Sequence, residues 1–334
     1  MNDSDPRDPD PQAAWQPTAT RRILESRAQQ LAWVRGFFAQ RGVLEVETPV
    51  LGQCGITDVN IDSVAAAPRA VAGQEHSGGW LQTSPEYHMK RLLAAGSGSI
   101  YQVSHVFRDG ERGRRHNPEF SLLEWYRPGF DDAQLMTEVA DLVCGWLALP
   151  EPDRMNYRQL MRDHAGVDPF EASDEDLRAA CRPLVGDAQL PAGMDRDACR
   201  DLLMSFQVEP ALGRGRPVFV THYPASQAAL ARVSREGGHR VAHRFELYVN
   251  GIELCNGYWE LTDPREQRRR FLDDNQRRRA LGKPEMPVDE RMLAALEAGL
   301  PECAGVALGL DRLLMLKCGA GDISEVLAFP AERS

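Results

Sequence analysis

The sequence lacks the marks of several protein classes. Its seven cysteines are scattered and never form a C-x-x-C pair, so we expect neither a disulfide framework nor a cysteine-ligated zinc site. No apolar run approaches the ~18 residues that a transmembrane helix needs, and the N-terminus has neither the basic region nor the apolar core of a signal peptide. The Gly-rich phosphate motifs of P-loop and Rossmann proteins are also missing. We therefore expect a cytoplasmic protein with no membrane partner.

Lysine is scarce as well, since only Lys90, Lys283 and Lys317 occur and arginine carries almost all the positive charge. The formal net charge of -10 argues against a protein that grips nucleic-acid phosphate over a large surface. With 43% hydrophobic and 26% charged residues, the composition is typical of a globular protein with a real core. Residues 1–17, rich in Asp and Pro, are predicted to form a disordered tail before one domain at 18–334.

The pattern of apolar residues predicts strands gathered in one sheet with helices around it. Ser84 and Pro85 are expected to be the N-cap and first residue of a helix that runs to Leu93. An alternating segment at 43–51, ended by Pro49, is expected to be a short strand. Further helices are predicted at 20–40, 132–149, 264–281 and 289–298, and further strands at 99–108, 119–127, 218–223 and 244–257. This order favours an α+β fold with a mainly antiparallel β-sheet flanked by helices.

The segment FRDGERGRRHNPEF, residues 107–120, carries five basic side chains in a loop between two strand-like runs. Arginine presents a fixed fork of donors that suits phosphate or carboxylate. The loop therefore indicates an anion site, although a solvated charged hairpin has the same composition.

The segment RFELYVNGIELCNGYWEL, residues 244–261, contains a strong two-residue hairpin signal at Asn250-Gly251. The hairpin pairs Tyr248 with Glu253 and makes Glu246 a diagonal neighbour of Glu253. Two adjacent carboxylates favour a cation such as Mg²⁺ with nucleotide phosphates. A bulge at Asn256-Gly257 would bring Glu260 to the same face. The alternative is a pair of solvent-facing carboxylates on an open sheet.

In GVALGLDRLLML, residues 305–316, a strand is followed by Gly309 and by a helix with Arg312 in its first turn. Glycine lets the backbone approach a flat ligand, and the arginine points at an anion. By itself this arrangement is weak evidence, because many helices carry a surface arginine near their start.

Three segments together resemble motifs 1, 2 and 3 of class II aminoacyl-tRNA synthetases: ETPVL with Pro49, the 107–120 hairpin, and GLDR with Arg312. TSPEYHMK, HNPEFSLLEWY and ELCNGYWEL further resemble the catalytic core of lysyl-tRNA synthetases. The resemblance extends from about Arg21 to Phe329. It implies the class II catalytic fold, a homodimer built around Pro49, and use of ATP and Mg²⁺.

The resemblance also implies roles for individual residues. Arg108 would hold the amino-acid carboxylate and the ATP α-phosphate, and Arg312 would hold the γ-phosphate, so these two are the candidate catalytic residues. Glu246 and Glu253 would bind Mg²⁺ and ATP. The remaining nucleotide contacts are Asp109, Gly110, Asn117, Phe120 as a stacking partner for adenine, and the backbone at Leu254 and Gly309.

The amino acid would be bound by a separate set of residues. Glu86 would accept its backbone amine, whereas Tyr126 and Glu260 would bind its side-chain ammonium. Two carboxylates facing two ammonium groups match a lysine-like substrate, since a buried carboxylate needs a cation. The same pocket would include Ser84, Pro85 and Ala307.

Three departures from lysyl-tRNA synthetases matter. A Pro/Asp tail stands where those enzymes have an anticodon-binding OB-fold, so we expect no anticodon-binding domain and no tRNA partner. Ala307 replaces a typical glycine and adds a methyl group in or beside the pocket. Gly110 replaces the first acidic residue of motif 2, where Glu111 is a possible substitute.

The first two departures, together with TSPEYHMKRLL, resemble the elongation factor P lysine ligase family. The resemblance implies that ATP adenylates (R)-β-lysine, which is then transferred to a lysine ε-amino group of elongation factor P, the protein partner. Two alternatives stay open: a truncated lysyl-tRNA synthetase-like enzyme, and a non-catalytic regulatory paralogue. Retention of Arg108, Glu253, Glu260 and Arg312 argues against the second, because a protein that only binds needs no Mg²⁺ carboxylates.

Overall fold

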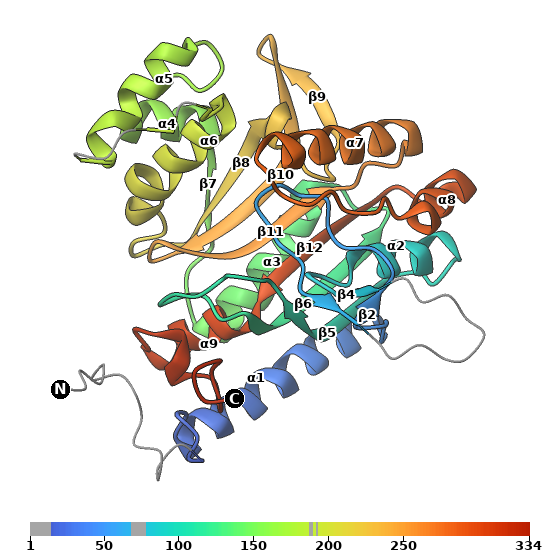
Figure 1. Cartoon of the computed structure of the whole chain (residues 1–334). Helices are drawn as coiled ribbons and strands as arrows, with labels where there is room; N and C mark the ends of the chain where they lie inside the picture. Colours follow the sequence, from blue (N-terminus) through green and yellow to red (C-terminus); the bar gives the residue numbers. More distant parts are fainter. Residues whose placement is uncertain (1–14, 68–77, 187–189, 192) are drawn as a thin grey trace, which may run out of the picture.

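The computed structural model describes residues 15–67, 78–186, 190–191 and 193–334 (Figure 1). All but the last three residues of the predicted tail at 1–17 lie outside this range. At the described end, the Thr18 backbone N–H donates to the Ala328 carbonyl at 2.9 Å and Arg333 donates to the Gln16 carbonyl at 3.1 Å. The start of the described chain is therefore bonded to its C-terminal segment.

The α-helices are α1 (Arg21–Gln40), α2 (Glu86–Ala94), α3 (Asp132–Leu147), α4 (Tyr157–Ala165), α5 (Asp174–Cys181), α6 (Arg196–Leu203), α7 (Pro264–Ala280), α8 (Glu290–Gly299) and α9 (Leu310–Cys318). The strands are β1 (Leu44–Glu45), β2 (Leu51–Gly52), β3 (Ala65–Ala66), β4 (Gly79–Leu81), β5 (Ile100–Phe107), β6 (Glu119–Pro128), β7 (Asp153–Asn156), β8 (Val218–Pro224), β9 (Val233–Glu236), β10 (His239–Val249), β11 (Ile252–Trp259) and β12 (Cys303–Gly309).

In the described part of the chain, nine strands form one sheet with the order β1-β5-β6-β12-β11-β10-β8-β7, and β9 pairs with β10 at one side. The pairs β1–β5 and β7–β8 are parallel, and the others are antiparallel. A small second sheet has the order β2-β4-β3. The prediction of an α+β fold with a mainly antiparallel sheet flanked by helices is confirmed.

One face of the large sheet is covered by α1, α3 and α9, which cross below and behind the strands in Figure 1. Apolar side chains from these helices and from alternate strand positions make the largest core, with Phe38, Trp125, Val139, Leu308 and Leu313 each fully buried. Because strand side chains alternate between faces, the positions between these core residues must face the other way. That opposite face carries the polar residues described below.

Local sequence signals explain where the helices begin. The Thr20 hydroxyl accepts from the Ile23 N–H and caps α1, so the helix predicted at 20–40 begins one residue later, at Arg21. Asp131 with Gln134 forms a capping box at α3. The prediction for α2 was wrong by one position. Pro85, not Ser84, is its N-cap and makes no side-chain cap, although the Ser84 hydroxyl lies 3.4 Å from the Glu86 N–H.

The predicted strand at 43–51 was also wrong as one element. It splits into β1, which pairs in parallel with β5, and β2, which pairs with β4 in the small sheet. Pro49 lies between them, where its missing N–H costs no ladder bond. The break leaves Leu44, Val50 and Leu51 exposed at 57%, 41% and 44%.

We expect this exposed apolar segment to be the contact between two copies of the chain. Three exposed aliphatic side chains within eight residues are typical of a protein interface more than of a free surface. Light scattering at micromolar protein should give the mass of a homodimer, and Leu51→Arg should shift that mass toward the monomer. A monomeric mass for the unmodified protein would contradict the expectation.

The described residues between 157 and 211 form a lobe of short helices at the β7–β8 edge of the sheet, at the upper left of Figure 1. Its apolar side chains, including Tyr157, Leu160, Leu177 and Leu203, pack with β8 and β10 in a second core. Within the described residues, no helix is both long enough and apolar enough to cross a membrane.

Candidate active site

The hairpin of β10 and β11 places the acidic residues of the site. Asn250 and Gly251 have φ of 51° and 71°, as a tight hairpin turn requires, and the pairing of Tyr248 with Glu253 is confirmed. The predicted bulge exists but lies at Leu254, because Leu247 pairs with Cys255 while Tyr248 pairs with Glu253. The extra residue at Leu254 shifts the alternation by one.

The shifted alternation gives β11 one polar face. The register pairs Glu246 with Asn256 and Arg244 with Tyr258, and Glu260 follows two residues later on the same side. The Arg244 side chain donates to Asn256 at 3.1 Å, and the Asn256 amide donates to the Tyr258 hydroxyl at 3.0 Å. The predicted consequence for Glu260 is therefore confirmed, although the bulge lies two residues before the predicted place.

Glu260 and Glu86 both reach the polar face, and the protein supplies a cation between them. The Lys90 Nζ atom lies 2.7 Å from Glu86 Oε1 and 2.7 Å from Glu260 Oε2. The Lys90 side chain is fully buried. Sequence analysis matched these two carboxylates only with substrate ammonium groups, and it did not foresee that Lys90 neutralises part of their charge.

Glu124 adds a third buried carboxylate that sequence analysis missed. Its Oε1 atom accepts from the Tyr126 hydroxyl at 2.6 Å. Burial and the charges of Glu86 and Glu260 raise the pKa of Glu124 well above its ordinary value. Side chains two residues apart on a strand share a face, so the sequence already indicated that Glu124 lies on the same face as Tyr126.

Four carboxylate oxygens of this pocket accept no hydrogen bond from the described residues. Glu86 Oε1 and Glu260 Oε2 face the Lys90 ammonium as ion pairs, whereas Glu124 Oε2 and Glu260 Oε1 have neither kind of partner. Burial raises the pKa of Glu260 to about 7, even though Lys90 acts to lower it. Buried carboxylate oxygens without donors are costly unless a ligand satisfies them. The pocket is therefore suited to a ligand that carries ammonium groups.

The strand beside this pocket has small residues at Gly305, Ala307 and Gly309. Gly305 pairs with Tyr126, and Ala307 pairs with Glu124 on one side and Asn256 on the other. A β-carbon at Gly305 would lie 2.3 Å from the Tyr126 ring and 2.6 Å from Glu260 Oε1. This register places Ala307 on the face of the sheet that carries Glu124 and Asn256.

Arg108 lies at the end of β5, where the predicted arginine loop begins. Its guanidinium is stacked over the Phe120 ring at 5.0 Å, and its Nε atom is buried without an acceptor among the described residues. Glu111 Oε1 lies 3.6 Å from Arg108 Nη1, so the two side chains form an ion pair at the start of the loop. Gly110 itself has φ of 74°, a conformation that favours glycine.

Asp109 and Asn117 hold this loop in position. The Asp109 N–H donates to the Asp62 carbonyl at 2.8 Å. The Asn117 amide donates to the Glu119 carbonyl at 2.6 Å and accepts from the Ala331 N–H at 3.0 Å. Both ends of the Asn117 side chain are thus bonded to backbone, which indicates that Asn117 shapes the loop between β5 and β6.

Arg312 joins the loop to the hairpin. It donates to the Glu253 carbonyl at 3.0 Å, lies 3.4 Å from Glu253 Oε2, and contacts His116 Nε2 at 2.7 Å. The Leu254 carbonyl lies 3.9 Å from where a β-carbon of Gly309 would be, so the two predicted backbone contacts are neighbours. The structure therefore brings Arg108, Glu253, Gly309 and Arg312 to one end of the polar face.

Glu246 is held more tightly than sequence analysis anticipated. Its Oε2 atom accepts from the Tyr223 and Tyr248 hydroxyls at 2.5 and 2.6 Å, and its Oε1 atom pairs with Arg244.

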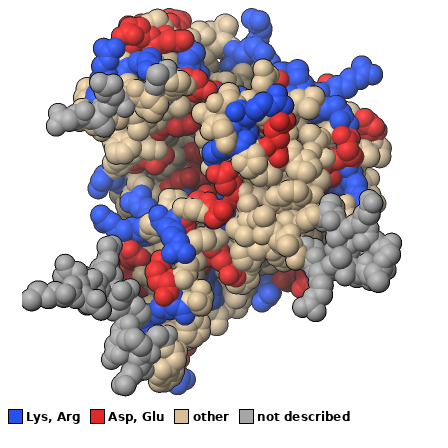
Figure 2. All heavy atoms as spheres, viewed as in Figure 1, with Lys and Arg blue, Asp and Glu red and all other residues tan. Residues whose placement is uncertain are grey.

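The nearby Glu209 was not singled out from the sequence. Burial raises the pKa of Glu209 to about 7, and the charges of Glu246 and Glu253 add to this shift. Figure 2 shows acidic side chains in the recess left of the centre, with basic ones at its left edge.

Glu253 and Glu246 would fit a magnesium ion that takes most of its ligands from phosphate and water. Burial and the charge of Glu246 raise the pKa of Glu253, so a cation beside this carboxylate would relieve the repulsion. Among the described residues, no group of three or more acidic, histidine or cysteine side chains forms a complete metal cage. Mg²⁺ commonly takes one or two carboxylates and completes its shell with phosphate oxygens and water.

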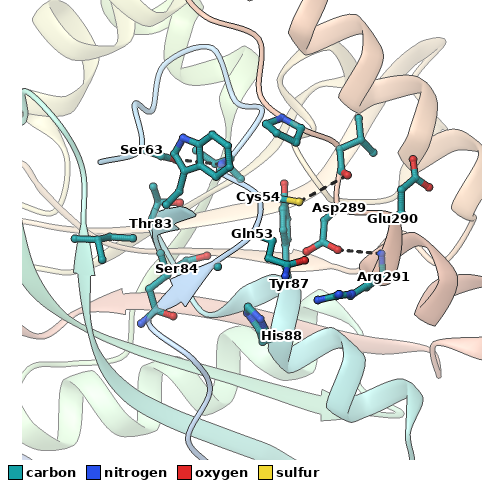
Figure 3. Close-up of a pocket in the computed structure, with 18 of the residues that line it drawn as sticks. Gln53, Cys54, Ser63, Thr83, Ser84, Tyr87, His88, Asp289, Glu290 and Arg291 are labelled. Carbon is teal, nitrogen blue, oxygen red and sulfur yellow. Dashed lines mark hydrogen bonds between the residues drawn. The ribbon is translucent and has the colours of Figure 1, made fainter. Parts of the chain in front are cut away.

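A separate cavity of about 370 Å³ lies along another side of α2 (Figure 3). Tyr87, His88 and Arg91 of α2 line it, whereas Glu86 and Lys90 of the same helix belong to the carboxylate pocket. Its lining includes Ser84 but not Glu86, Tyr126 or Glu260. Burial raises the pKa of Cys54 in this cavity to about 11, so the thiol stays protonated at neutral pH.

The family of the chain follows from comparison with known proteins. A family model described as tRNA synthetases class II (D, K and N) matches residues 13–333. The chain belongs to this family. Class II synthetases couple ATP to the activation of an amino acid, and the arginines and carboxylates of the polar face are the residue types that such a reaction needs. The expected class II catalytic fold is thereby confirmed.

Proposed function

We propose that this class II chain activates (R)-β-lysine with ATP and transfers it to the ε-amino group of a lysine on elongation factor P in the cytoplasm. The observation that carries the choice of amino acid is the charge of the pocket. Glu86, Glu124 and Glu260 place three carboxyl groups in the pocket, whereas Lys90 supplies one cation. Burial and its neighbours raise the pKa of Glu124, and an ammonium group bound beside it would favour its ionised form. A ligand with two ammonium groups balances the remainder.

The position of Ala307 supports the β-isomer. Its methyl group lies between Glu124 and Asn256 in the sheet register and is half-buried, so it borders space that a ligand can enter. In β-lysine the amine is one carbon farther from the carboxylate than in α-lysine. A methyl group on the pocket floor favours the isomer whose amine is displaced from it.

The reaction proceeds by positioning and charge stabilisation. Arg108 holds the amino-acid carboxylate against the α-phosphate, and its buried Nε without a protein acceptor is available for that anion. Carboxylate oxygen attacks the α-phosphorus, and pyrophosphate leaves toward Arg312. The acceptor amine then attacks the acyl carbon, an amide bond forms, and AMP leaves. Phe120, Asp109 and the backbone at Gly110 border the nucleotide.

Glu253 would hold Mg²⁺, with Glu246 beside it. The ion would neutralise the charge that develops on the β- and γ-phosphates. The Glu246 side chain is held by Arg244, Tyr223 and Tyr248 whether or not the ion is bound.

The test is the intact mass of elongation factor P after incubation with the protein, ATP, Mg²⁺ and either (R)-β-lysine or α-lysine. A gain of one lysyl unit, greater with β-lysine, is the expected result. A parallel reaction with lysine tRNA separates the alternatives. Charged tRNA with unmodified protein would favour a lysyl-tRNA synthetase-like enzyme, and release of no pyrophosphate would favour a non-catalytic paralogue.

Ala307→Gly should shift the preference toward α-lysine. Removing one methyl group from a contact of this kind changes discrimination by about 1–3 kcal/mol, roughly 5- to 150-fold. The measurement is the ratio of kcat/KM for the two isomers in ATP–pyrophosphate exchange. An unchanged ratio would remove Ala307 from the explanation of specificity.

A further inference from the structure

Lys90 has an environment that the reaction above does not use. Its ammonium is fully buried and lies 2.7 Å from two carboxylates that belong to different elements, Glu86 on α2 and Glu260 just after β11. Burial alone would lower the pKa of Lys90, but the two carboxylates raise it above its ordinary value. The lysine is therefore charged inside the protein.

Charged lysines are rarely buried this completely, and this chain has only three lysines in all. Lys283 and Lys317, by contrast, are partly or largely exposed. Arginine is abundant in this chain, yet its guanidinium is larger and planar and donates hydrogen bonds only in a fixed fork. A compact ammonium suits the place between Glu86 and Glu260.

We propose that Lys90 is a positioning residue that sets the charge of the amino-acid pocket so that a diamino acid neutralises it. This inference rests on the proposed function. Lys90 forms ion pairs with Glu86 Oε1 and Glu260 Oε2, whereas Glu260 Oε1 and Glu124 Oε2 have no partner among the described residues and are available to the substrate. A monoamino acid leaves one negative charge buried and unpaired.

Without Lys90 the pocket would hold three carboxylates and no resident cation. Like charges in a buried site cannot all ionise, so a further carboxyl besides Glu124, whose pKa is already raised, would keep a proton at neutral pH. A protonated carboxyl binds an ammonium group poorly. Binding of the amino acid would then improve as pH rises, until the retained proton is lost.

The test compares Lys90→Met with the unmodified protein in amino-acid-dependent ATP–pyrophosphate exchange at pH 6.5, 7.5 and 8.5. We expect the KM for (R)-β-lysine to rise about 10-fold or more at pH 7.5, while the KM for ATP stays within about 2-fold. The KM of the variant should keep falling up to pH 8.5. That of the unmodified protein should level off above the pKa of Glu260, which is about 7.

Two further variants separate charge from packing. Lys317→Met makes the same substitution on α9, away from the polar face, and should leave both KM values unchanged. Lys90→Ala should regain exchange when ethylammonium is added, because the small cation can occupy the vacated place, whereas tetramethylammonium should not help. If Lys90→Met does not fold, Lys90→Met with Glu86→Gln should fold, because one buried charge is removed with its partner.

The thermal midpoint gives a reading that needs no substrate. Buried carboxyls with raised pKa values stabilise the fold below the ordinary carboxyl pKa, and this stability is lost as pH rises through the raised value. The thermal midpoint of Lys90→Met should therefore be lower than that of the unmodified protein, and the difference should grow from pH 5 to pH 8. Parallel midpoints, or a variant with unchanged KM and pH profile, would overturn the inference.

The outcomes distinguish this inference from the proposed function. If no diamino acid supports ATP–pyrophosphate exchange by the unmodified protein, the proposed function fails. The thermal midpoints of the two proteins as a function of pH still decide whether Lys90 neutralises the pocket. If it exchanges with (R)-β-lysine and Lys90→Met behaves identically, only the role of Lys90 fails.

Discussion

Arg108→Ala should lower amino-acid-dependent ATP–pyrophosphate exchange by about 10³-fold or more, because a preorganised cation at a transferring phosphoryl group supplies an effect of this size. The substitution removes the guanidinium that stacks over Phe120 and whose buried Nε has no acceptor among the described residues. Exchange within about 2-fold of normal would exclude Arg108 from adenylate formation.

The fold should survive this change. Arg108 makes its contact with the neighbouring strand segment through backbone, since its N–H donates to the Pro118 carbonyl at 2.9 Å, and alanine keeps that bond. The thermal midpoint is the check. Arg21→Ala is a matched control on the first turn of α1, where the side chain is 92% exposed, and it should leave exchange unchanged.

Gly305→Ala should weaken amino-acid binding. The added β-carbon would lie 2.3 Å from the Tyr126 ring and 2.6 Å from Glu260 Oε1, distances at which something must move. Tyr126 is buried and bonded to Glu124, so the ring cannot retreat without breaking the pocket. Overpacking of this kind costs about 1–3 kcal/mol, and displacing two pocket side chains should raise the amino-acid KM by at least about 10-fold.

Gly36→Ala supplies the control for the same substitution. A β-carbon at Gly36, within α1, would meet nothing within 4 Å. Alanine favours a helix by up to about 1 kcal/mol over glycine, so this variant should be as stable as the unmodified protein or more so. If Gly305→Ala also keeps its KM and midpoint, the close packing around Gly305 is not required for substrate binding.

The sequence allowed the strongly periodic elements to be predicted, and the structure confirms them. The helix capped by Thr20 and the hairpin at Asn250-Gly251 each depend on contacts within a few residues, which a local pattern records. The bulge was placed two residues late, at Asn256-Gly257 and not at Leu254. A bulge is fixed by the partner strand, and glycine content alone does not locate it.

The site could be predicted as a set of residues but not as a balance of charge. Glu86 and Glu260 were matched with a diamine, and Lys90, four residues after Glu86, was not considered. The pairing of Lys90 with Glu260 spans 170 positions of the chain and follows from tertiary packing alone. Glu124 was accessible by alternation from Tyr126, whereas the three donors to Glu246 come from two strands and have no local signature.

The order of strands has a consequence for how the protein is made. Strand β12 lies between β6 and β11, yet it is synthesised last of the three. Until it is inserted, the β5–β6 pair and the β10–β11 hairpin cannot join, and Tyr126 and Glu260 have no Gly305 between them. Contacts that close such long loops form slowly. On the ribosome, the amino-acid pocket should therefore be among the last parts to form, after nearly the whole chain has emerged.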